Sequence, residues 1–211
     1  MAVTFDAANA GNNGGSGNIA TVALTVGSGA NQAVLACMST NSSSDVVLRV
    51  TCDGVRMTLV PYADTVQTAF FRNLMFVTTG LAPGSHTFVA SGQTDTFVIL
   101  GLASFFGVHQ ERPVDQVHAL FATATSTSPS SVIPSQPGDM TVDFVSDIPD
   151  VPGSPTQTEA WVSAGAASSF AAAIGSSNTH GWTLNDSTTW LQCGAALKAV
   201  GNQPGFGFAR L

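Results

Sequence analysis

The sequence predicts an all-β protein, built as an antiparallel two-sheet β-sandwich. Short apolar runs rich in β-branched residues recur along the chain, and turn residues separate them about every eight to twelve residues. One pair of runs is joined by Asp53 and Gly54, and a two-residue Asp-Gly loop is the strongest short-range signal for a type I′ hairpin. No segment has a convincing apolar repeat of helical period. Together these observations favour strands throughout the chain.

The hairpin over residues 46–60, VVLRVTCDGVRMTLV, is the clearest element. Alternate residues of a strand share a face. One face of this ribbon is therefore apolar, and it comprises Val46, Leu48, Val50, Cys52, Val55, Met57 and Leu59. A two-stranded ribbon cannot bury such a face alone, so further strands must cover it.

The other strands expected in the first half, in chain order, are residues 3–6, 19–26, 32–39, 69–78, 85–90 and 97–106. Residues 7–17 are expected to form a flexible loop because they are dominated by Gly, Asn and Ala. The segment 97–106, FVILGLASFF, is the most hydrophobic and belongs in the middle of a sheet. Gly101 within it indicates a bulge or a close approach to the backbone.

The second half contains the less regular elements. Two short edge strands with their turn are expected around residues 120–133, and further strands at 140–145 and 190–200. Residues 107–117 and the proline-rich 147–158 are expected to be loops. Residues 161–174 fit either a strand or a short helix, because alanine prefers the helix whereas Gly165 and the serine pairs weaken it.

Short strands at this spacing are typical of a sandwich of jelly-roll type. No internal repeat is evident, so we expect a single domain over residues 1–200. The tail at 201–211, GNQPGFGFARL, has too many glycines to form a packed element of its own. It is either a disordered terminus or an extended C-terminal arm that docks onto a neighbouring subunit through apolar residues.

Composition limits the kinds of partner. The chain has 211 residues and a net charge of −7, and only 9% of its residues are charged. It has a single lysine, Lys198, so it cannot neutralise a row of phosphates, and neither nucleic acid nor an anionic membrane is an expected partner. The first residues do not resemble a secretory signal, which predicts a protein that folds where it is made. The three widely spaced cysteines are expected to be reduced core residues.

The sequence contains no catalytic signature and predicts neither a cofactor nor a metal ion. The only glutamates, Glu111 and Glu159, have no second acid two residues away, so a glycosidase pair is not expected. The four histidines are far apart in the sequence and are expected at exposed loop or rim positions. The acidic residues Asp139, Asp143, Asp147 and Asp150 are expected to lie in solvated loops, with a calcium site as the alternative.

Several phrases, taken together, resemble a large group of jelly-roll domains found in tailed-phage virion proteins and in some bacterial extracellular proteins. In order they are VTFDAANAG, TVALTVGSGANQAVLACMS, VTCDGVRMTLV, LAPGSHTFVAS, ILGLASFFGVHQERPVDQ, PGDMTVDFVSD and WLQCGAALKAV, spread over residues 3–200. The group shares no catalytic residues that could be carried over to this chain, and one fold of this kind hosts many functions.

The resemblance implies a non-enzymatic virion protein, made in the host cytoplasm and present in many copies, of the capsid decoration or cement type. Its partners would be the major capsid protein or other virion proteins, and it would be a possible homo-oligomer. The apolar anchors and charge expected to bind such a partner are Phe206, Phe208, Arg210 and Leu211. The alternative is a carbohydrate-binding or host-adhesion module, in which an exposed Trp182 would be the platform for a glycan.

Overall fold

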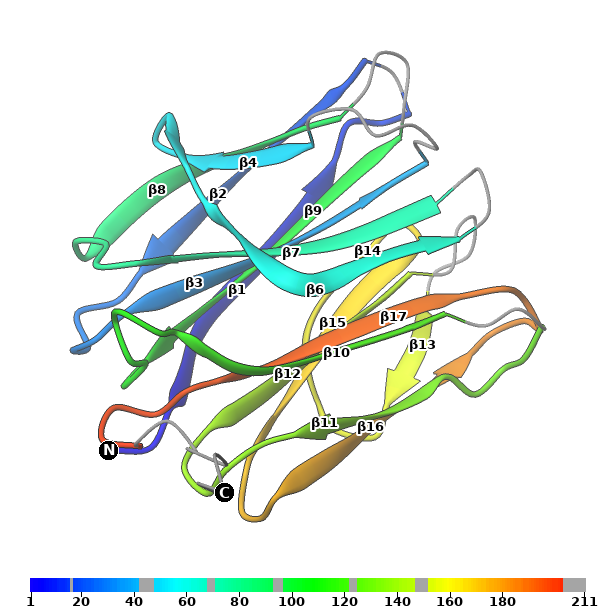
Figure 1. Ribbon diagram of the computed structural model, residues 1–211. Helices are drawn as coiled ribbons and strands as arrows, with labels where there is room; N and C mark the ends of the chain where they lie inside the picture. Colours follow the sequence, from blue (N-terminus) through cyan, green and yellow to red (C-terminus); the bar gives the residue numbers. More distant parts are fainter. Residues whose placement is uncertain are drawn as a thin grey trace, which may run out of the picture.

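In the computed structural model the chain is built from antiparallel β-strands (Figure 1). The structure describes residues 1–15, 17–41, 48–67, 71–92, 97–121, 125–146 and 152–202, and for residues 62–67, 71 and 116–121 it describes the backbone alone. No helix long and apolar enough to span a membrane occurs in this part of the chain. The predicted all-β class is confirmed.

The first half of the chain forms two sheets. The N-inner sheet has the strand order β1-β9-β3-β7-β6, and the N-outer sheet has the order β2-β8-β4-β5. Their strands are β1 (Thr4–Asn12), β2 (Ile19–Val26), β3 (Ala33–Thr40), β4 (Arg49–Cys52), β5 (Val55–Arg56), β6 (Thr58–Gln67), β7 (Phe71–Thr79), β8 (Gly84–Ser91) and β9 (Val98–Phe106).

The second half forms two more sheets. The C-inner sheet has the order β10-β17-β12-β15-β14, and the C-outer sheet has the order β11-β16-β13. Their strands are β10 (Val114–Phe121), β11 (Ser130–Pro134), β12 (Met140–Ser146), β13 (Pro152–Pro155), β14 (Thr158–Ser163), β15 (Ala166–Ala172), β16 (Ser177–Leu184) and β17 (Leu191–Leu197). The sequence predicts two sheets, whereas the described residues form four.

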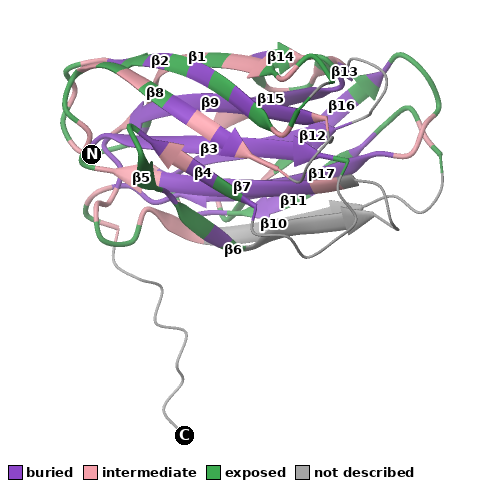
Figure 2. Ribbon diagram, turned by 90° about the horizontal axis from the view of Figure 1, so that it is seen from above, coloured by how far each residue is buried: buried purple, intermediate pink, exposed green. Residues whose placement is uncertain are grey.

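The four sheets are stacked in the order N-outer, N-inner, C-inner, C-outer (Figure 1). Three interiors separate them, and most of the strand residues that face these interiors are buried (Figure 2). Between the two N-terminal sheets lie residues such as Val22, Phe76 and Phe88. Between the two inner sheets Leu35 and Phe105 share one cluster with C-terminal residues such as Phe144 and Leu197. The inner sheets therefore join both halves through a continuous apolar core.

The C-terminal half repeats the strand order of the N-terminal half. The N-inner order β1-β9-β3-β7-β6 corresponds strand by strand to the C-inner order β10-β17-β12-β15-β14. The N-outer order β2-β8-β4 corresponds in the same way to the C-outer order β11-β16-β13. The correspondence preserves the order along the chain, and β5 alone has no counterpart. The repeat is one of topology, which explains why no repeat is evident in the sequence.

The two inner sheets also match in register. One row of paired residues crosses the N-inner sheet at Phe5, Phe105, Ala33 and Thr79. The corresponding row crosses the C-inner sheet at Val114, Leu197, Met140 and Ala172. Directly after this row the first strand of each sheet is interrupted by a bulge, between Phe5 and Ala7 in β1 and between Val114 and Gln116 in β10. Positions can therefore be equated residue by residue between the two sheets.

The structure confirms two local predictions. Asp53 and Gly54 have φ angles of 49° and 83°, and a type I′ turn requires positive φ at both positions. Gly101 in β9 lies under the indole of Trp161 from β14, so closely that a Cβ on Gly101 would be 1.9 Å from Trp161 Cζ2. The close approach predicted at Gly101 is therefore real, and its partner is a side chain of the facing inner sheet.

The second arm of the hairpin departs from the prediction. Val55 and Leu59 are 72% and 42% exposed, although Met57 is buried as expected. The reason is that β5 pairs only with β4 and ends at Arg56, after which the chain passes to the N-inner sheet as β6. The two arms therefore do not form one continuous apolar face.

Several expected loops contain strands. β1 continues to Asn12, β10 begins at Val114, β13 lies within the proline-rich segment, and β16 occupies residues 177–184. Backbone pairing with a neighbouring strand stabilises each of them, and this pairing is not visible in the side-chain pattern. The Ala- and Ser-rich region left open between strand and helix contains parts of two strands, β14 and β15.

Candidate functional site

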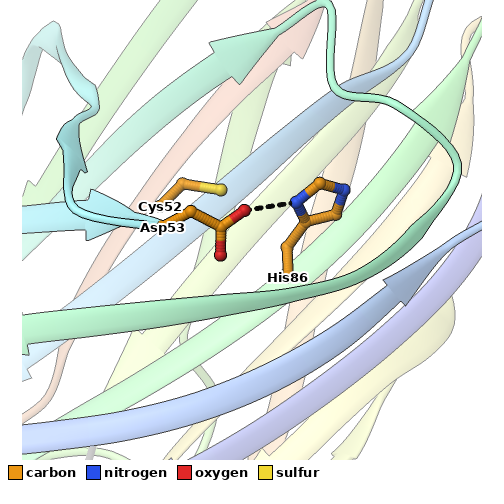
Figure 3. A group of neighbouring side chains, drawn as sticks. All are labelled: Cys52, Asp53 and His86. Atoms are coloured by element: carbon orange, nitrogen blue, oxygen red, sulfur yellow. Dashed lines mark hydrogen bonds and ion pairs between the residues drawn. The ribbon is translucent and has the colours of Figure 1, made fainter.

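The tip of the β4–β5 hairpin brings three potential metal-binding side chains together (Figure 3). Cys52 ends β4, Asp53 is the first turn residue, and His86 lies on the neighbouring strand β8. The Asp53 amide donates to Thr87 O at 2.8 Å, which sets His86 beside the turn. One ligand atom from each of the three residues lies within 4.8 Å of the other two. Cys52, Asp53 and His86 are termed the hairpin-tip cluster.

The hydrogen bonds of His86 define its charge. Its Nε2 lies 2.8 Å from Ala82 O, and because a carbonyl oxygen only accepts, Nε2 carries a proton. Its Nδ1 lies 2.6 Å from Asp53 Oδ2, where an ionised carboxylate also only accepts, so a second proton makes the ring an imidazolium. The hydrogen bond to Ala82 O and then that to Asp53 raise the pKa of His86 above its usual value.

The same surroundings shift the pKa values of Asp53 and Cys52. The hydrogen bond from the Thr87 amide, followed by that from His86, lowers the pKa of Asp53 below its usual value. Cys52 faces the N-terminal apolar interior and is 4% exposed. Burial, with a smaller contribution from the Asp53 charge, raises the pKa of its thiol to about 11. Below the raised pKa of His86 the cluster therefore holds a neutral thiol next to an ion pair.

The sequence did not reveal this cluster. The sequence predicts that Cys52 is a core residue and that His86 lies apart from the other histidines. Neither prediction brings the two residues together. The two residues meet because β4 pairs with β8 in a register that sets Cys52 opposite Phe88. The Asp-Gly turn shows where β4 ends, but a pattern of strands does not show which strand lies next to it.

A second cluster is buried between the C-inner and C-outer sheets, with Asp143 of β12 at its centre. Asp143 Oδ1 accepts hydrogen bonds from the amide and the hydroxyl of Ser169, at 3.0 and 2.5 Å. Oδ2 accepts from Trp182 Nε1 at 2.6 Å and from Gln192 Nε2 at 2.7 Å. His180 Nδ1 lies 3.4 Å from Oδ1, and its Nε2 contacts Thr141 Oγ1 at 2.9 Å. The buried polar cluster is Asp143, Ser169, His180, Trp182 and Gln192, all of them at most 3% exposed.

The geometry of the buried polar cluster is that of a structural network. The Ser169 hydroxyl contacts Asp143 directly, so His180 does not stand between serine and aspartate as the base of a nucleophilic triad does. Ser169, Asp143 and His180 are each 0% exposed, which leaves a substrate no route to them in this conformation. The Asp143 carboxylate instead joins the two sheets, since Oδ2 accepts from Trp182 of the C-outer sheet while Ser169 and Gln192 bind it from the C-inner sheet.

The corresponding interior of the N-terminal half is apolar. The matched register equates Asp143 with Ala36, Ser169 with Phe76 and Gln192 with Leu100. These three counterparts belong to the apolar cluster between the N-inner and N-outer sheets. The same strand arrangement therefore forms around an apolar interior, and the polar cluster is specific to the second half.

The structure corrects the expected exposure of Trp182. The residue is 3% exposed, and its indole nitrogen donates to Asp143. The ring packs with Leu184 and Val145 in the small apolar cluster beside the C-outer sheet. It therefore offers no free face on which a sugar ring could stack, and Trp182 is not a glycan platform.

The other residues singled out from the sequence are dispersed. Asp139 and Asp143 are buried instead of lying in solvated loops, and Asp139 accepts hydrogen bonds from the Ala199 amide and the Asn202 side chain. Asp147 and Asp150 lie outside the described residues. So do Phe206, Phe208, Arg210 and Leu211 of the C-terminal tail. The three cysteines are buried and none of them forms a disulfide, as predicted.

The single lysine is buried as well. Lys198 follows β17 and is 1% exposed, and its Nζ lies 3.8 Å from Asp115 Oδ1 at the bulge of β10. Asp115 also accepts a hydrogen bond from Gln136 Nε2 at 3.1 Å. The single lysine therefore forms an internal ion pair.

Comparison with known proteins adds no further assignment, since no family model and no curated protein matches this chain.

Proposed function

We propose that this protein is a non-enzymatic structural protein of a tailed-phage virion, a capsid decoration or cement protein that binds the outer shell and stabilises the particle. The observation that carries the proposal is the stacking of four sheets, of which the two inner ones share a continuous apolar core. Such a body is stiff, and few of its residues are charged. A cement protein needs a stiff body that bridges neighbouring shell subunits, and many weak contacts repeated over a particle give high avidity.

We further infer that each half is a jelly roll. A jelly roll consists of eight strands in two sheets, connected as two Greek keys. Numbered within each half, with β5 left out, the inner sheets have the order 1-8-3-6-5 and the outer sheets the order 2-7-4. This order supports the assignment, and the chain would then be a tandem of two jelly rolls joined through their inner sheets.

The proposed attachment uses the C-terminal tail. The chain is fixed up to Asn202, whose side-chain amide donates to Pro137 O and to Asp139 Oδ1. The amino group of Met1 donates to Val200 O, so the start of the chain lies at the same place. The tail beyond Asn202 contains Phe206 and Phe208, and burial of a phenylalanine on a partner contributes about 1.5–3 kcal/mol.

The test is occupancy on particles. Gradient-purified virions from cells that produce this chain are analysed by quantitative mass spectrometry for copies of the chain per major capsid protein. A chain that ends at Asn202 removes the tail without removing the hydrogen bonds that Asn202 makes. We expect its occupancy to fall while its thermal unfolding midpoint stays that of the full chain.

Two results would contradict parts of this proposal. Absence of the full chain from intact particles would exclude the virion role altogether. Equal occupancy of the full and shortened chains would exclude the tail and leave the sheet surfaces as the attachment site. A glycan array of the full chain separates the alternative function, because a decoration protein should bind its shell without dependence on sugar.

A further inference from the structure

We propose that the hairpin-tip cluster is a binding site for one divalent transition-metal ion, with zinc as the preferred ion. Thiolate sulfur, imidazole nitrogen and carboxylate oxygen are the three ligand types that proteins use for Zn²⁺. The cluster supplies one of each from two adjacent strands, within 4.8 Å of one another. Figure 3 shows the three side chains directed toward a common point. The site is separate from the proposed virion role and does not depend on it.

The ligand atoms are oriented by contacts made through the other end of each side chain. His86 Nε2 donates to Ala82 O, which fixes the ring and leaves Nδ1 facing Asp53. Asp53 Oδ1 accepts from the Thr87 amide at 2.8 Å, which leaves Oδ2 facing His86. Outer contacts of this kind orient metal ligands and raise their affinity. The backbone of the type I′ turn holds Cys52 and Asp53 in fixed positions.

The gap between His86 and Asp53 already requires a positive charge. Without one, the Nδ1 lone pair would face a carboxylate oxygen at 2.6 Å. A proton supplies that charge in the ion pair described above. A zinc ion would supply it equally well, with the two donors moving apart to reach metal–ligand distances of about 2.0–2.2 Å.

The remaining ligand positions suit a partly open site. The side chain of Asp53 is 51% exposed and that of His86 13% exposed, whereas Cys52 is buried. Water therefore reaches the cluster from the Asp53 side, and it can complete a tetrahedral set of ligands.

Metal binding must displace protons from the ligands. The Cys52 thiol gives up its proton to become the thiolate ligand, and His86 binds through a deprotonated Nδ1. Zinc binding should therefore become tighter as the pH rises.

The experiment measures Zn²⁺ binding to the full chain by competition with a chelating dye over a pH series. We expect one ion per chain and a dissociation constant that falls as the pH rises. Cobalt is the second probe, because Co²⁺ bound to a thiolate in a tetrahedral site shows a sulfur-to-metal charge-transfer band and strong visible absorption. Cys52→Ser and His86→Gln should each weaken zinc binding at least about 10-fold, and Cys52→Ser should remove the charge-transfer band.

The matched control is His109→Gln, which removes a histidine that does not belong to the hairpin-tip cluster and should leave zinc binding unchanged. Thermal unfolding of every variant without metal shows whether it is folded. Binding weaker than millimolar, or equal binding by the folded Cys52→Ser variant and the parent chain, would overturn the proposal. A loss of binding in His109→Gln would assign the metal to a different site and overturn it as well.

Discussion

The ion pair of His86 and Asp53 gives the metal-free protein a pH dependence at the scale of single residues. The pKa of His86 is raised from 6.5, so its contribution is complete below pH 6.5 and is lost as the pH rises through the raised pKa. The pKa of Asp53 is lowered from 3.8, so its contribution is complete above pH 3.8 and is lost as the pH falls through the lowered pKa. Stability from this pair is therefore greatest between pH 3.8 and 6.5.

We expect the unfolding midpoint of the metal-free protein to decline when the pH rises through the pKa of His86. Asp53→Asn removes the charge that favours the imidazolium and should flatten this part of the profile. The measurement is thermal unfolding by circular dichroism over a pH series with a chelator present, and the ring protons of His86 in NMR spectra report its titration directly. An unchanged profile in Asp53→Asn would show that the pair does not control it.

Gly101 offers a second test at this scale. Any side chain at this position would overlap the indole of Trp161, a rigid ring held between the two inner sheets. We expect Gly101→Ala to lower the free energy of unfolding by about 1–3 kcal/mol, as overpacking does. Gly175→Ala is the control, because nothing lies within 4 Å of a Cβ there. Chemical denaturation of both variants gives the difference, and equal stabilities would mean that Trp161 can move aside.

At the scale of elements, the buried polar cluster ties β12 to β15, β16 and β17. Asp143→Asn keeps the size of the side chain but replaces one accepting oxygen by an NH₂ group. The amide would then face the donors of Ser169, Trp182 or Gln192, and at least one buried donor would lose its partner. We expect a loss of about 2–4 kcal/mol, since an unpaired buried group costs about 1–3 kcal/mol and hydrogen bonds to charged groups are stronger.

Asp186→Asn is the control for this change, because Asp186 is exposed and its replacement should alter stability by less than about 0.5 kcal/mol. Chemical denaturation measures both variants. If Asp143→Asn were as stable as the parent, the network would contribute specificity without net stability, as some buried polar groups do.

Elements were predictable from the sequence where side chains and turn residues determine them. The alternating strand β2, the hydrophobic strand β9 and the type I′ turn at Asp53 and Gly54 all follow from patterns that single strands carry. Strand β1 was predicted over residues 3–6 alone and β16 was missed, because small and polar residues form these segments and their stability comes from pairing with partners far along the chain. The hairpin-tip cluster was missed for the same reason, since it depends on which strand lies beside β4.

The whole molecule depends on the contact between its two inner sheets. If the halves were expressed separately, residues 1–110 would keep the N-inner and N-outer sheets but would expose the apolar face that includes Leu35, Met75 and Phe105. An apolar face that is exposed to water favours association with other molecules. We expect this fragment to form oligomers or precipitate, as measured by size-exclusion chromatography with light scattering. A soluble monomeric fragment as stable as the full chain would show that the halves fold independently.

The burial of Lys198 makes the folded molecule unusual toward amine-reactive reagents. Its single lysine is enclosed beside Asp115, so the native fold presents no lysine side chain to an activated ester. Acylation of Lys198 would require the C-terminal half to open. The rate of this acylation would therefore measure how often the folded protein opens there.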